Sequence, residues 1–228
     1  MFILGNKNNP VRTSVSIDNL IEGYRRFRAT RFEEARGLYR ELERRGQSPK
    51  VLFIACCDSR VDPATITDSG PGELFVIRNV ANLVPPYTPD GRHHGTSAAL
   101  EFAVRNLEVD DIVVMGHVQC GGARALLQGA DRTASEHDFI GNWMALAAEV
   151  RDQLADAAPQ ADGANLATQM EHAIVRLSLR NLMTFDWVRE RVAAGTLRLH
   201  GWYYGIAEGV LFAMDPESGR FNPIPDNG

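Results

Sequence analysis

The chain has 228 residues, and its 24 lysines and arginines against 29 aspartates and glutamates give a formal net charge of −5. A hydrophobic content of 44% is ordinary for a globular protein, and a chain of this length can bury a core without a disulfide or metal to hold it together. The acidic balance without a long basic run argues against a nucleic-acid partner, and three cysteines cannot all pair within one chain, which excludes a disulfide scaffold.

The first element in chain order is a helix or helix pair over residues 16–46. Apolar residues recur there largely at spacings of three and four, with many Arg and Glu between them. Ser16 can cap the start of this segment, and Gly46 stops it. Further helices are expected at residues 96–107 with Thr96 as the cap, from Gly121 onward, and at 139–158 and 165–194 with a polar break around 159–163.

Apolar runs between these helices predict the strands of a sheet. The continuous run at residues 51–55 suits a strand that is covered on both faces, and further strands are expected at 73–77, 111–115, 197–203 and 209–214. Strands that alternate with helices predict an α/β fold with a mainly parallel sheet of about five strands flanked by helices. We expect a single domain over residues 1–228, with a helical arm (1–46), an α/β core (47–214) and an irregular tail (215–228).

The sequence lacks the features of a membrane or secreted protein. Its start, MFILGN, has no basic segment followed by an apolar stretch of signal-peptide length. The longest apolar runs, at residues 51–57 and 112–116, fall far short of the ~20 residues that cross a bilayer. We therefore expect a cytoplasmic protein with no membrane partner, in a reducing compartment that suits free or metal-bound thiolates.

Two of the predicted strands continue into segments that carry thiols. Cys56 follows the strand at 51–55, whereas His117 and Cys120 follow the strand at 111–115. Sites in open parallel sheets form beyond the carboxyl ends of the strands, so these three side chains could converge there. A single cysteine ending an apolar strand is more often a small buried hydrophobe. Two cysteines and a histidine together match the ligand preferences of zinc and leave a fourth position for water.

These segments resemble a known family. Cys56-x-Asp58-Ser59-Arg60 and His117-x-x-Cys120-Gly121-Gly122 look like the two-part zinc motif of the β-class carbonic anhydrases. The stretches at residues 71–82 and 200–205 are also similar to that family, and the resemblance covers residues 47–209. It implies reversible hydration of CO2 to bicarbonate, one Zn²⁺ per subunit, and an N-terminal arm that embraces a second subunit in a homodimer or a higher even-numbered homo-oligomer.

The resemblance also implies a chemistry for the metal. Zinc lowers the pKa of bound water toward about 7 in a favourable site. Two thiolates and a neutral imidazole leave Zn²⁺ with a formal charge near zero, so this water should be less acidic than in an all-histidine site. We therefore expect activity that rises with pH through an apparent pKa above ~7.

Asp58 and Arg60 are the catalytic residues that the resemblance implies. In the family the aspartate accepts a hydrogen bond from zinc-bound hydroxide, and the arginine keeps that aspartate ionised and oriented. In an inactive state of some members the aspartate binds zinc itself. The alternative is a surface ion pair worth under ~1 kcal/mol.

The substrate-binding residues follow from the resemblance as well: Gln47, which can come from the neighbouring subunit, the apolar side chains of Phe75, Val80 and Phe102, and the backbone N–H of Gly122. Core packing alone would also explain the three apolar residues, and Phe102 stands where the plant-like branch usually has tyrosine. A second, inhibitory bicarbonate site of one branch uses Trp, Arg and Tyr. Here Arg78 and Tyr204 match, but Phe53 replaces the tryptophan, which favours the plant-like, non-allosteric type.

Other reactive side chains are assigned no role. Cys57 is interpreted as a bystander thiol, and the pair His93-His94 as solvated loop residues. Two alternative functions stay open: the same fold and zinc site hydrolysing carbonyl sulfide or carbon disulfide, and a non-catalytic, zinc-binding regulatory protein. The complete set of motif residues argues against the second alternative.

Overall fold

The computed structural model describes residues 15–156 and 165–225, so the polar break predicted at 159–163 lies outside the described residues. Contacts divide the chain into two compact units, residues 1–47 and residues 48–228. The expectation of one domain over the whole chain stays a prediction.

The described part of the first unit consists of three helices, α1 (Ile17–Ala29), α2 (Arg31–Glu34) and α3 (Arg36–Arg45). Ser16 caps α1, as predicted, by accepting a hydrogen bond from the Asn19 N–H. The predicted helix or helix pair over residues 16–46 is divided into three helices, with breaks at Thr30 and Ala35. Rings of the three helices meet in a small aromatic cluster, whose centroids lie 5.1–6.3 Å apart: Phe27, Phe32 and Tyr39.

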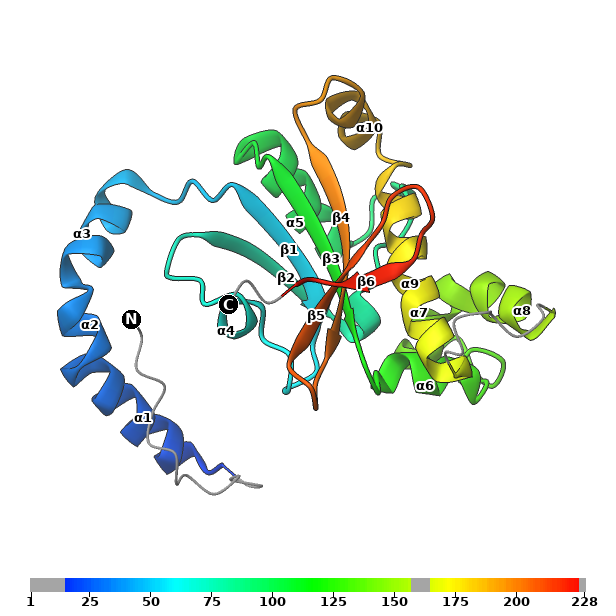
Figure 1. The fold of residues 1–228 in the computed structure, drawn as a ribbon, viewed down its shortest axis with the longest axis horizontal. Helices are drawn as coiled ribbons and strands as arrows, with labels where there is room; N and C mark the ends of the chain where they lie inside the picture. Colours follow the sequence, from blue (N-terminus) through cyan, green and yellow to red (C-terminus); the bar gives the residue numbers. More distant parts are fainter. Residues whose placement is uncertain (1–14, 157–164, 226–228) are drawn as a thin grey trace. The chain divides into compact units, whose positions relative to one another are not determined.

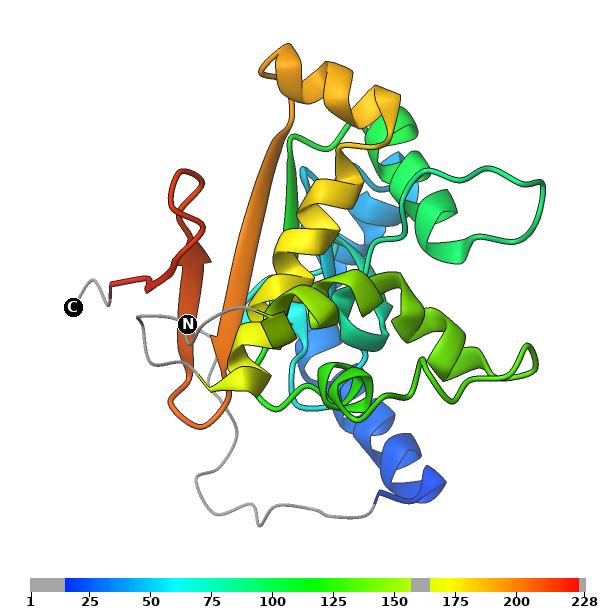
Figure 2. The same cartoon turned by 90° about the vertical axis from the view of Figure 1, so that its right-hand side faces the viewer.

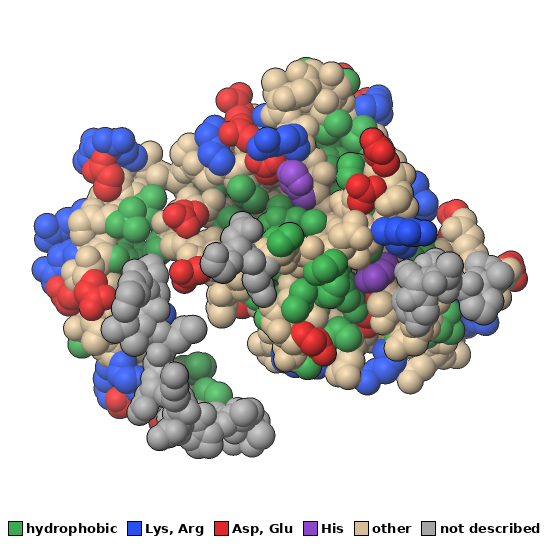
Figure 3. All heavy atoms as spheres, in the orientation of Figure 1, with side chains coloured by type: hydrophobic (Ala, Val, Ile, Leu, Met, Phe, Trp, Pro, Cys, Tyr) green, Lys and Arg blue, Asp and Glu red, His purple; other side chains and the backbone are tan. Residues whose placement is uncertain are grey.

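No helix of this first unit contains a buried residue. The exposed apolar side chains of α1 include Ile17, Leu20 and Tyr24, each more than half exposed. Between them, basic and acidic side chains pair along the surface, as with Arg25 and Glu22, and Figure 3 shows blue and red side chains next to one another over this segment. Among residues 15–47, the apolar face of α1 therefore stays largely exposed.

The second unit is built on a six-stranded sheet (Figure 1). Its strands lie in the order β2-β1-β3-β4-β5-β6. The first four are parallel to one another, β5 is antiparallel to β4, and β6 is antiparallel to β5. They are β1 (Val51–Cys56), β2 (Leu74–Asn79), β3 (Asp111–His117), β4 (Arg198–Gly205), β5 (Val210–Met214) and β6 (Phe221–Pro223). The mainly parallel α/β fold is confirmed, and β6 is an addition from the tail that was expected to be irregular.

Alternate residues of the central strands supply two cores, as the period of two in a strand requires. Phe53 and Met115 belong to one cluster, which also contains residues of α6 (Gly121–Leu127), α7 (Phe139–Met144) and α8 (Ala148–Asp156). Leu52 and Ile112 belong to the other, with residues of α5 (Gly95–Glu101) and α10 (Asp186–Ala193). The long helix α9 (Leu166–Leu182) contributes to both clusters and lies along the central strands (Figure 2).

Several boundaries differ from the predicted ones. The helix expected at 96–107 starts at Gly95, with His94 rather than Thr96 at its cap, and changes to a π-helix at Phe102–Asn106. The helix expected at 165–194 is interrupted between α9 and α10, and a short helix, α4 (Pro63–Ile66), follows β1. Short 3-10 turns occur at Val80–Asn82 and Ala145–Ala147. Within the described residues, no helix combines the length and the apolar character needed to cross a membrane.

Candidate metal centre

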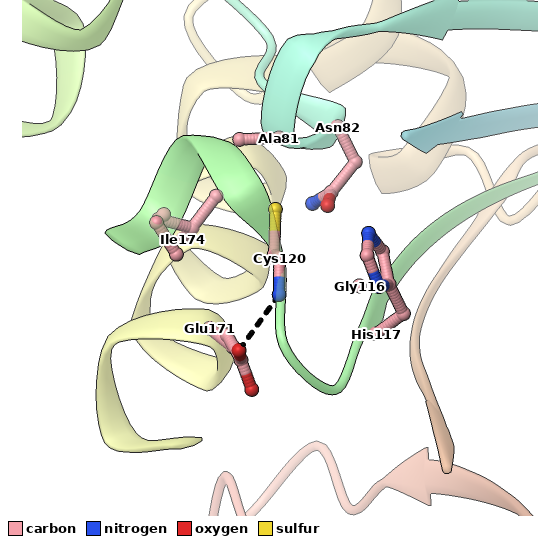
Figure 4. Close-up of a pocket in the computed structure, with 8 residues that line it drawn as sticks. Ala81, Asn82, Gly116, His117, Cys120, Glu171 and Ile174 are labelled. Atoms are coloured by element: carbon pink, nitrogen blue, oxygen red, sulfur yellow. Dashed lines mark hydrogen bonds between the residues drawn. The ribbon is translucent and has the colours of Figure 1, made fainter. Parts of the chain in front are cut away.

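The predicted ligands converge at the carboxyl end of the parallel strands. Cys56 is the last residue of β1, His117 is the last residue of the neighbouring β3, and Cys120 is the cap residue of α6. One ligand atom of each, the two Sγ atoms and a ring nitrogen, lies within 4.8 Å of the others. All three side chains are buried, and in Figure 4 those of Cys120 and His117 both point away from Glu171.

His117 is oriented for metal binding through its distal nitrogen. Its Nδ1 lies 2.9 Å from the carbonyl oxygen of Val118, which can only accept a hydrogen bond, so Nδ1 carries the proton. Its Nε2 is buried and has no hydrogen-bond partner. A buried polar atom without a partner is costly, and a metal ion would relieve that cost.

The two thiols perturb each other. A hydrogen bond from Cys120 is the main cause that lowers the pKa of the Cys56 thiol, although burial opposes this. The same thiol–thiolate contact, together with burial, raises the pKa of Cys120. Without a metal the pair therefore retains one shared proton, which a metal ion would displace on binding.

The donor set and its spacing fit zinc. Zn–S bonds of about 2.3 Å and Zn–N bonds of about 2.0–2.1 Å in a tetrahedron hold ligand atoms roughly 3.4–3.8 Å apart. The ligand atoms here are separated by at most 4.8 Å, so small side-chain rotations would close the site. Three protein ligands leave a fourth tetrahedral position, as in catalytic rather than structural zinc sites.

Asp58 lies beside this cluster and is held there by Arg60. The guanidinium donates from Nε to Oδ1 at 2.9 Å and from Nη2 to Oδ2 at 2.7 Å, a bidentate pair that fixes the carboxylate plane. Asp58 Oδ2 is 3.9 Å from His117 Nε2. Hydrogen bonding by Arg60 is the main cause that holds the pKa of Asp58 well below its usual range. The carboxylate is therefore ionised next to the candidate metal position.

The loop that carries Asp58 is fastened by Arg78 of β2. Its guanidinium donates to the carbonyl oxygens of Cys56 at 2.9 Å, Asp58 at 2.7 Å and Val61 at 3.1 Å. Sequence reasoning considered Arg78 only as part of an inhibitory bicarbonate site. Nothing in the sequence pattern indicated this role, because the acceptors are backbone atoms.

Sequence reasoning also missed Glu171, which lies behind the ligands. Its Oε1 accepts the Cys120 N–H at 3.0 Å, and its Oε2 accepts the Tyr203 hydroxyl at 2.6 Å (Figure 4 shows the first bond). The residue is 4% exposed, and burial raises its pKa while these two donors oppose the rise. An acidic residue between Met170 and Ile174, both fully buried, was the available signal.

Two of the predicted substrate-binding residues lie next to the metal ligands. Val80 follows Asn79, which is the register partner of Cys56. A Cβ on Gly122 would lie 2.8 Å from the side chains of Val80 and Ala81, so α6 packs at a distance that only glycine allows.

The other predicted substrate residues lie elsewhere. Phe75 is the register partner of Leu52, four residues before Cys56, which is about 13 Å along the strand at ~3.3 Å per residue. Phe102 packs on Phe75 at 5.9 Å between ring centroids and is 43% exposed. Gln47 is exposed and belongs to the first unit. The core unit of one chain therefore does not bring the two phenylalanines to the metal ligands.

An open cleft of about 760 Å³ adjoins the site. It is lined by Cys57, Asn79, Val80, Pro85, residues 93–97, Phe139, Ile140 and Trp143. Cys57 is exposed into this region, while its neighbour Cys56 is buried among the ligands. Adjacent residues of an extended chain point to opposite sides, which is why Cys57 is absent from the ligand cluster.

Comparisons with known proteins agree with this geometry. The family model described as carbonic anhydrase matches residues 51–211. The chain is 37% identical over 199 residues to a carbonic anhydrase of Synechocystis sp., an alignment that covers 87% of this chain and 71% of that protein. The solved structure of the β-carbonic anhydrase CcaA superposes with a TM-score of 0.82 at 35% identity, covering 92% of this chain and 93% of that one. One of two tetrameric β-carbonic anhydrases from Sordaria macrospora gives a TM-score of 0.71 at 27% identity, with coverage of 86% and 95%.

Proposed function

We propose that this chain, which belongs to the β-class carbonic anhydrase family, catalyses the zinc-dependent, reversible hydration of carbon dioxide to bicarbonate and a proton. One observation carries the proposal: a buried Cys56–His117–Cys120 cluster lies beside a carboxylate that Arg60 holds ionised and oriented. The metal ligands and the catalytic dyad come from one edge of the sheet, next to the open cleft that Cys57, Asn79 and Val80 help to line.

Cys56, His117 and Cys120 would hold one Zn²⁺ per subunit. When bound, zinc would act as a Lewis acid that makes a water molecule acidic enough to supply a nucleophile near neutral pH. His117 contributes its Nε2 because Nδ1 is bound to the Val118 carbonyl, and the low pKa of Cys56 makes its thiolate readily available. The chain therefore presents the His117 nitrogen without a proton, whereas the thiol pair would release its shared proton when zinc binds.

Asp58 would orient the attacking oxygen. An ionised carboxylate only accepts hydrogen bonds, so a water or hydroxide beside Oδ2 must direct its proton at Asp58 and its lone pair elsewhere. Arg60 prevents the carboxylate from rotating, since it engages both oxygens and also donates to the Gln119 carbonyl at 3.2 Å. The carboxylate is thereby preorganised before the substrate arrives.

The proposed substrate pocket uses a second copy of the chain. Val80 and the Gly122 N–H would contact the substrate from the same chain as the metal, whereas Gln47, Phe75 and Phe102 would come from the partner. The separation of Phe75 from Cys56 along the sheet supports this, as do the exposed apolar residues of α1. We therefore propose a homodimer, or a higher even-numbered assembly, in the cytoplasm.

The plant-like, non-allosteric type remains part of the proposal. Phe53 is buried against Trp202, with ring centroids 5.7 Å apart, and offers no polar group to an anion. The guanidinium of Arg78 already donates to three backbone carbonyls of the Asp58 loop. An inhibitory anion at this place would have to compete with those bonds.

Stopped-flow measurement of CO2 hydration, run with metal analysis on the same sample, tests the proposal. We expect about one zinc per chain, activity lost on chelation and restored by zinc, and a rate that rises with pH through an apparent pKa above ~7. A zinc-loaded protein with no CO2 hydration would overturn it. A parallel assay of sulfide release then separates the two alternatives: an enzyme that hydrolyses carbonyl sulfide or carbon disulfide would release sulfide, and a regulatory zinc protein would not.

A further inference from the structure

The turn between His117 and Cys120 carries two of the three metal ligands on four residues. Gln119 within it has a φ of +56°, a left-handed conformation that a residue other than glycine adopts only at a cost. Such a turn stays in place only if its surroundings hold it. What holds this turn therefore decides where the ligands point.

The solvent side of the turn is held by the catalytic arginine, since Arg60 Nη2 donates to the Gln119 carbonyl at 3.2 Å. The interior side is held by Glu171, whose Oε1 accepts the next N–H, that of Cys120, at 3.0 Å. The two contacts bind the carbonyl oxygen and the N–H of the same peptide group, the one that joins Gln119 to Cys120. Arg60 is already part of the proposed mechanism, but Glu171 is not.

Glu171 is itself held in place by a hydrogen bond from Tyr203 and by the close packing of its helix, α9, against the sheet. Its second oxygen accepts the Tyr203 hydroxyl at 2.6 Å, and Tyr203 lies on β4 as the register partner of Gly116. A Cβ on Gly116 would lie 2.8 Å from Val175 Cγ2 of α9, so helix and strand approach as closely as a glycine permits. The carboxylate cannot move away from the turn without disturbing this packing.

A carboxylate that is 4% exposed is expensive to bury, and packing alone would be better served by an apolar residue. Its two hydrogen bonds run to the backbone of a metal ligand and to one tyrosine hydroxyl. Both bonds join α9 to residues distant in the sequence, 51 positions away at Cys120 and 32 positions away at Tyr203, and the first of them ends on the backbone of a candidate metal ligand. The hydrogen bond to the ligand turn therefore accounts for a carboxylate that is costly to bury at this position.

We propose that Glu171 is a positioning residue of the metal centre: with the Tyr203 hydroxyl, its carboxylate fixes the Cys120 backbone so that Cys120 and His117 face one ion. The inference rests on the proposed zinc site and adds a determinant of its geometry. Glu171 touches neither metal nor substrate, and it acts through the Cys120 N–H.

The test compares metal binding by the full-length wild type with that of Glu171→Ala, Glu171→Gln and Tyr203→Phe. Zinc affinity is measured by competition with a chromophoric chelator, and site geometry by the visible spectrum of the Co²⁺-substituted protein. We expect Glu171→Ala to bind zinc about 10- to 100-fold more weakly and to shift the Co²⁺ bands. Glu171→Gln should lie closer to wild type, because its amide oxygen can still accept the Cys120 N–H.

Leu177→Ala is the matched control, since Leu177 is buried on the same helix and makes no hydrogen bond to the turn. It should lower the melting temperature while the zinc affinity and the Co²⁺ spectrum stay at wild-type values. Unchanged affinity and an unchanged spectrum in Glu171→Ala would overturn the proposal. If Glu171→Ala does not fold, Tyr203→Phe decides: weaker zinc binding supports the role and unchanged binding contradicts it.

CO2 hydration is measured on the same preparations to separate this inference from the proposed function. A wild type that binds zinc but does not hydrate CO2 would contradict the function, and the ratio of zinc affinities would still decide the role of Glu171. Full activity in the wild type with unaltered zinc binding in the variants would contradict only the inference.

Discussion

The side chains of the metal centre are buried within their own unit, whereas the apolar side chains of the N-terminal helices are exposed. At the centre, Cys56, His117 and Cys120 are at most 5% exposed, and the adjoining backbone and carboxylate groups have hydrogen-bond partners within residues 48–228. In the described part of the first unit no helical residue is buried, and Ile17 and Tyr24 are exposed by more than 60%.

The contrast distinguishes a ligand cluster whose residues all come from one unit of one chain from a helix face that is exposed in that chain. The ligand cluster and the Asp58–Arg60 pair need nothing from outside their unit. An amphipathic helix whose apolar face is exposed gains stability only when something covers that face. Substitutions in the two regions should therefore have different consequences: loss of metal or activity at the ligand cluster, and loss of assembly at α1.

Removing a ligand should abolish function. His117→Ala deletes the only nitrogen ligand of the cluster, and we expect zinc content near zero and CO2 hydration at the uncatalysed rate. Metal analysis and stopped-flow assay measure both. Cys57→Ser is the matched control, because Cys57 is exposed and outside the cluster, and it should keep its zinc and its activity. Full zinc loading of His117→Ala would refute the ligand assignment.

Breaking the catalytic pair should remove activity but not metal. Asp58→Asn keeps the shape of the side chain but loses its charge, and we expect kcat/KM to fall by about 10²–10³-fold while zinc content is retained. Arg60→Lys should be less damaging, since lysine supplies charge without the bidentate geometry. An unchanged rate in Asp58→Asn would exclude the carboxylate from the mechanism.

Making α1 polar should affect assembly and leave the metal ligands intact. The double substitution Leu20→Asp and Tyr24→Asp places charges on the exposed apolar face. We expect a smaller mass in light scattering, unchanged zinc content, and lower activity if Gln47 serves the partner's site. An unaltered assembly would show that this face does not bind a second copy.

Glycine-to-alanine substitutions at Gly122 in α6 and at Gly37 in α3 should change the free energy of unfolding in opposite directions. Gly122→Ala meets Val80 and Ala81 at 2.8 Å and should reduce the free energy of unfolding by about 1–3 kcal/mol. Gly37→Ala in α3 meets nothing within 4 Å and should raise it by about 0.4–1 kcal/mol. Gly121→Ala, also without near neighbours, is the control for α6. Denaturant titration measures all three, and equal effects would contradict the packing contrast.

The smallest effect concerns acid stability. Because Arg60 lowers the pKa of Asp58 in the folded state, the pair stabilises the protein above the unfolded-state pKa of about 3.9, and this contribution is lost as the pH falls below it. With Arg60 partly exposed, we expect at most about 1 kcal/mol. The melting temperatures of wild type and Asp58→Asn should therefore converge below pH 4, and a constant difference down to pH 2 would contradict this.

Much of the core could be predicted because its signals are local. The apolar runs at 51–55 and 111–115 require burial on both faces, and the residues that follow such strands meet at one sheet edge. Those two facts were enough to bring Cys56, His117 and Cys120 together. Boundaries were less certain: α5 starts one residue before Thr96, with His94 at the cap position and no side-chain cap hydrogen bond, so the capping residue expected from the sequence did not set the helix start.

The sequence by itself indicated the alternation of strands and helices, the three candidate ligands and the Asp58–Arg60 pair, since each of these rests on a short segment: a strand or helix and the residues that follow it. Only the tertiary structure decided that Arg78 fastens the Asp58 loop, that Glu171 reaches the Cys120 backbone across 51 positions, and that Phe75 lies four residues below the ligands. The reason is physical: periodicity and motif spacing are properties of short segments. Strand register and the docking of α9 are set by packing between segments that are distant in the sequence.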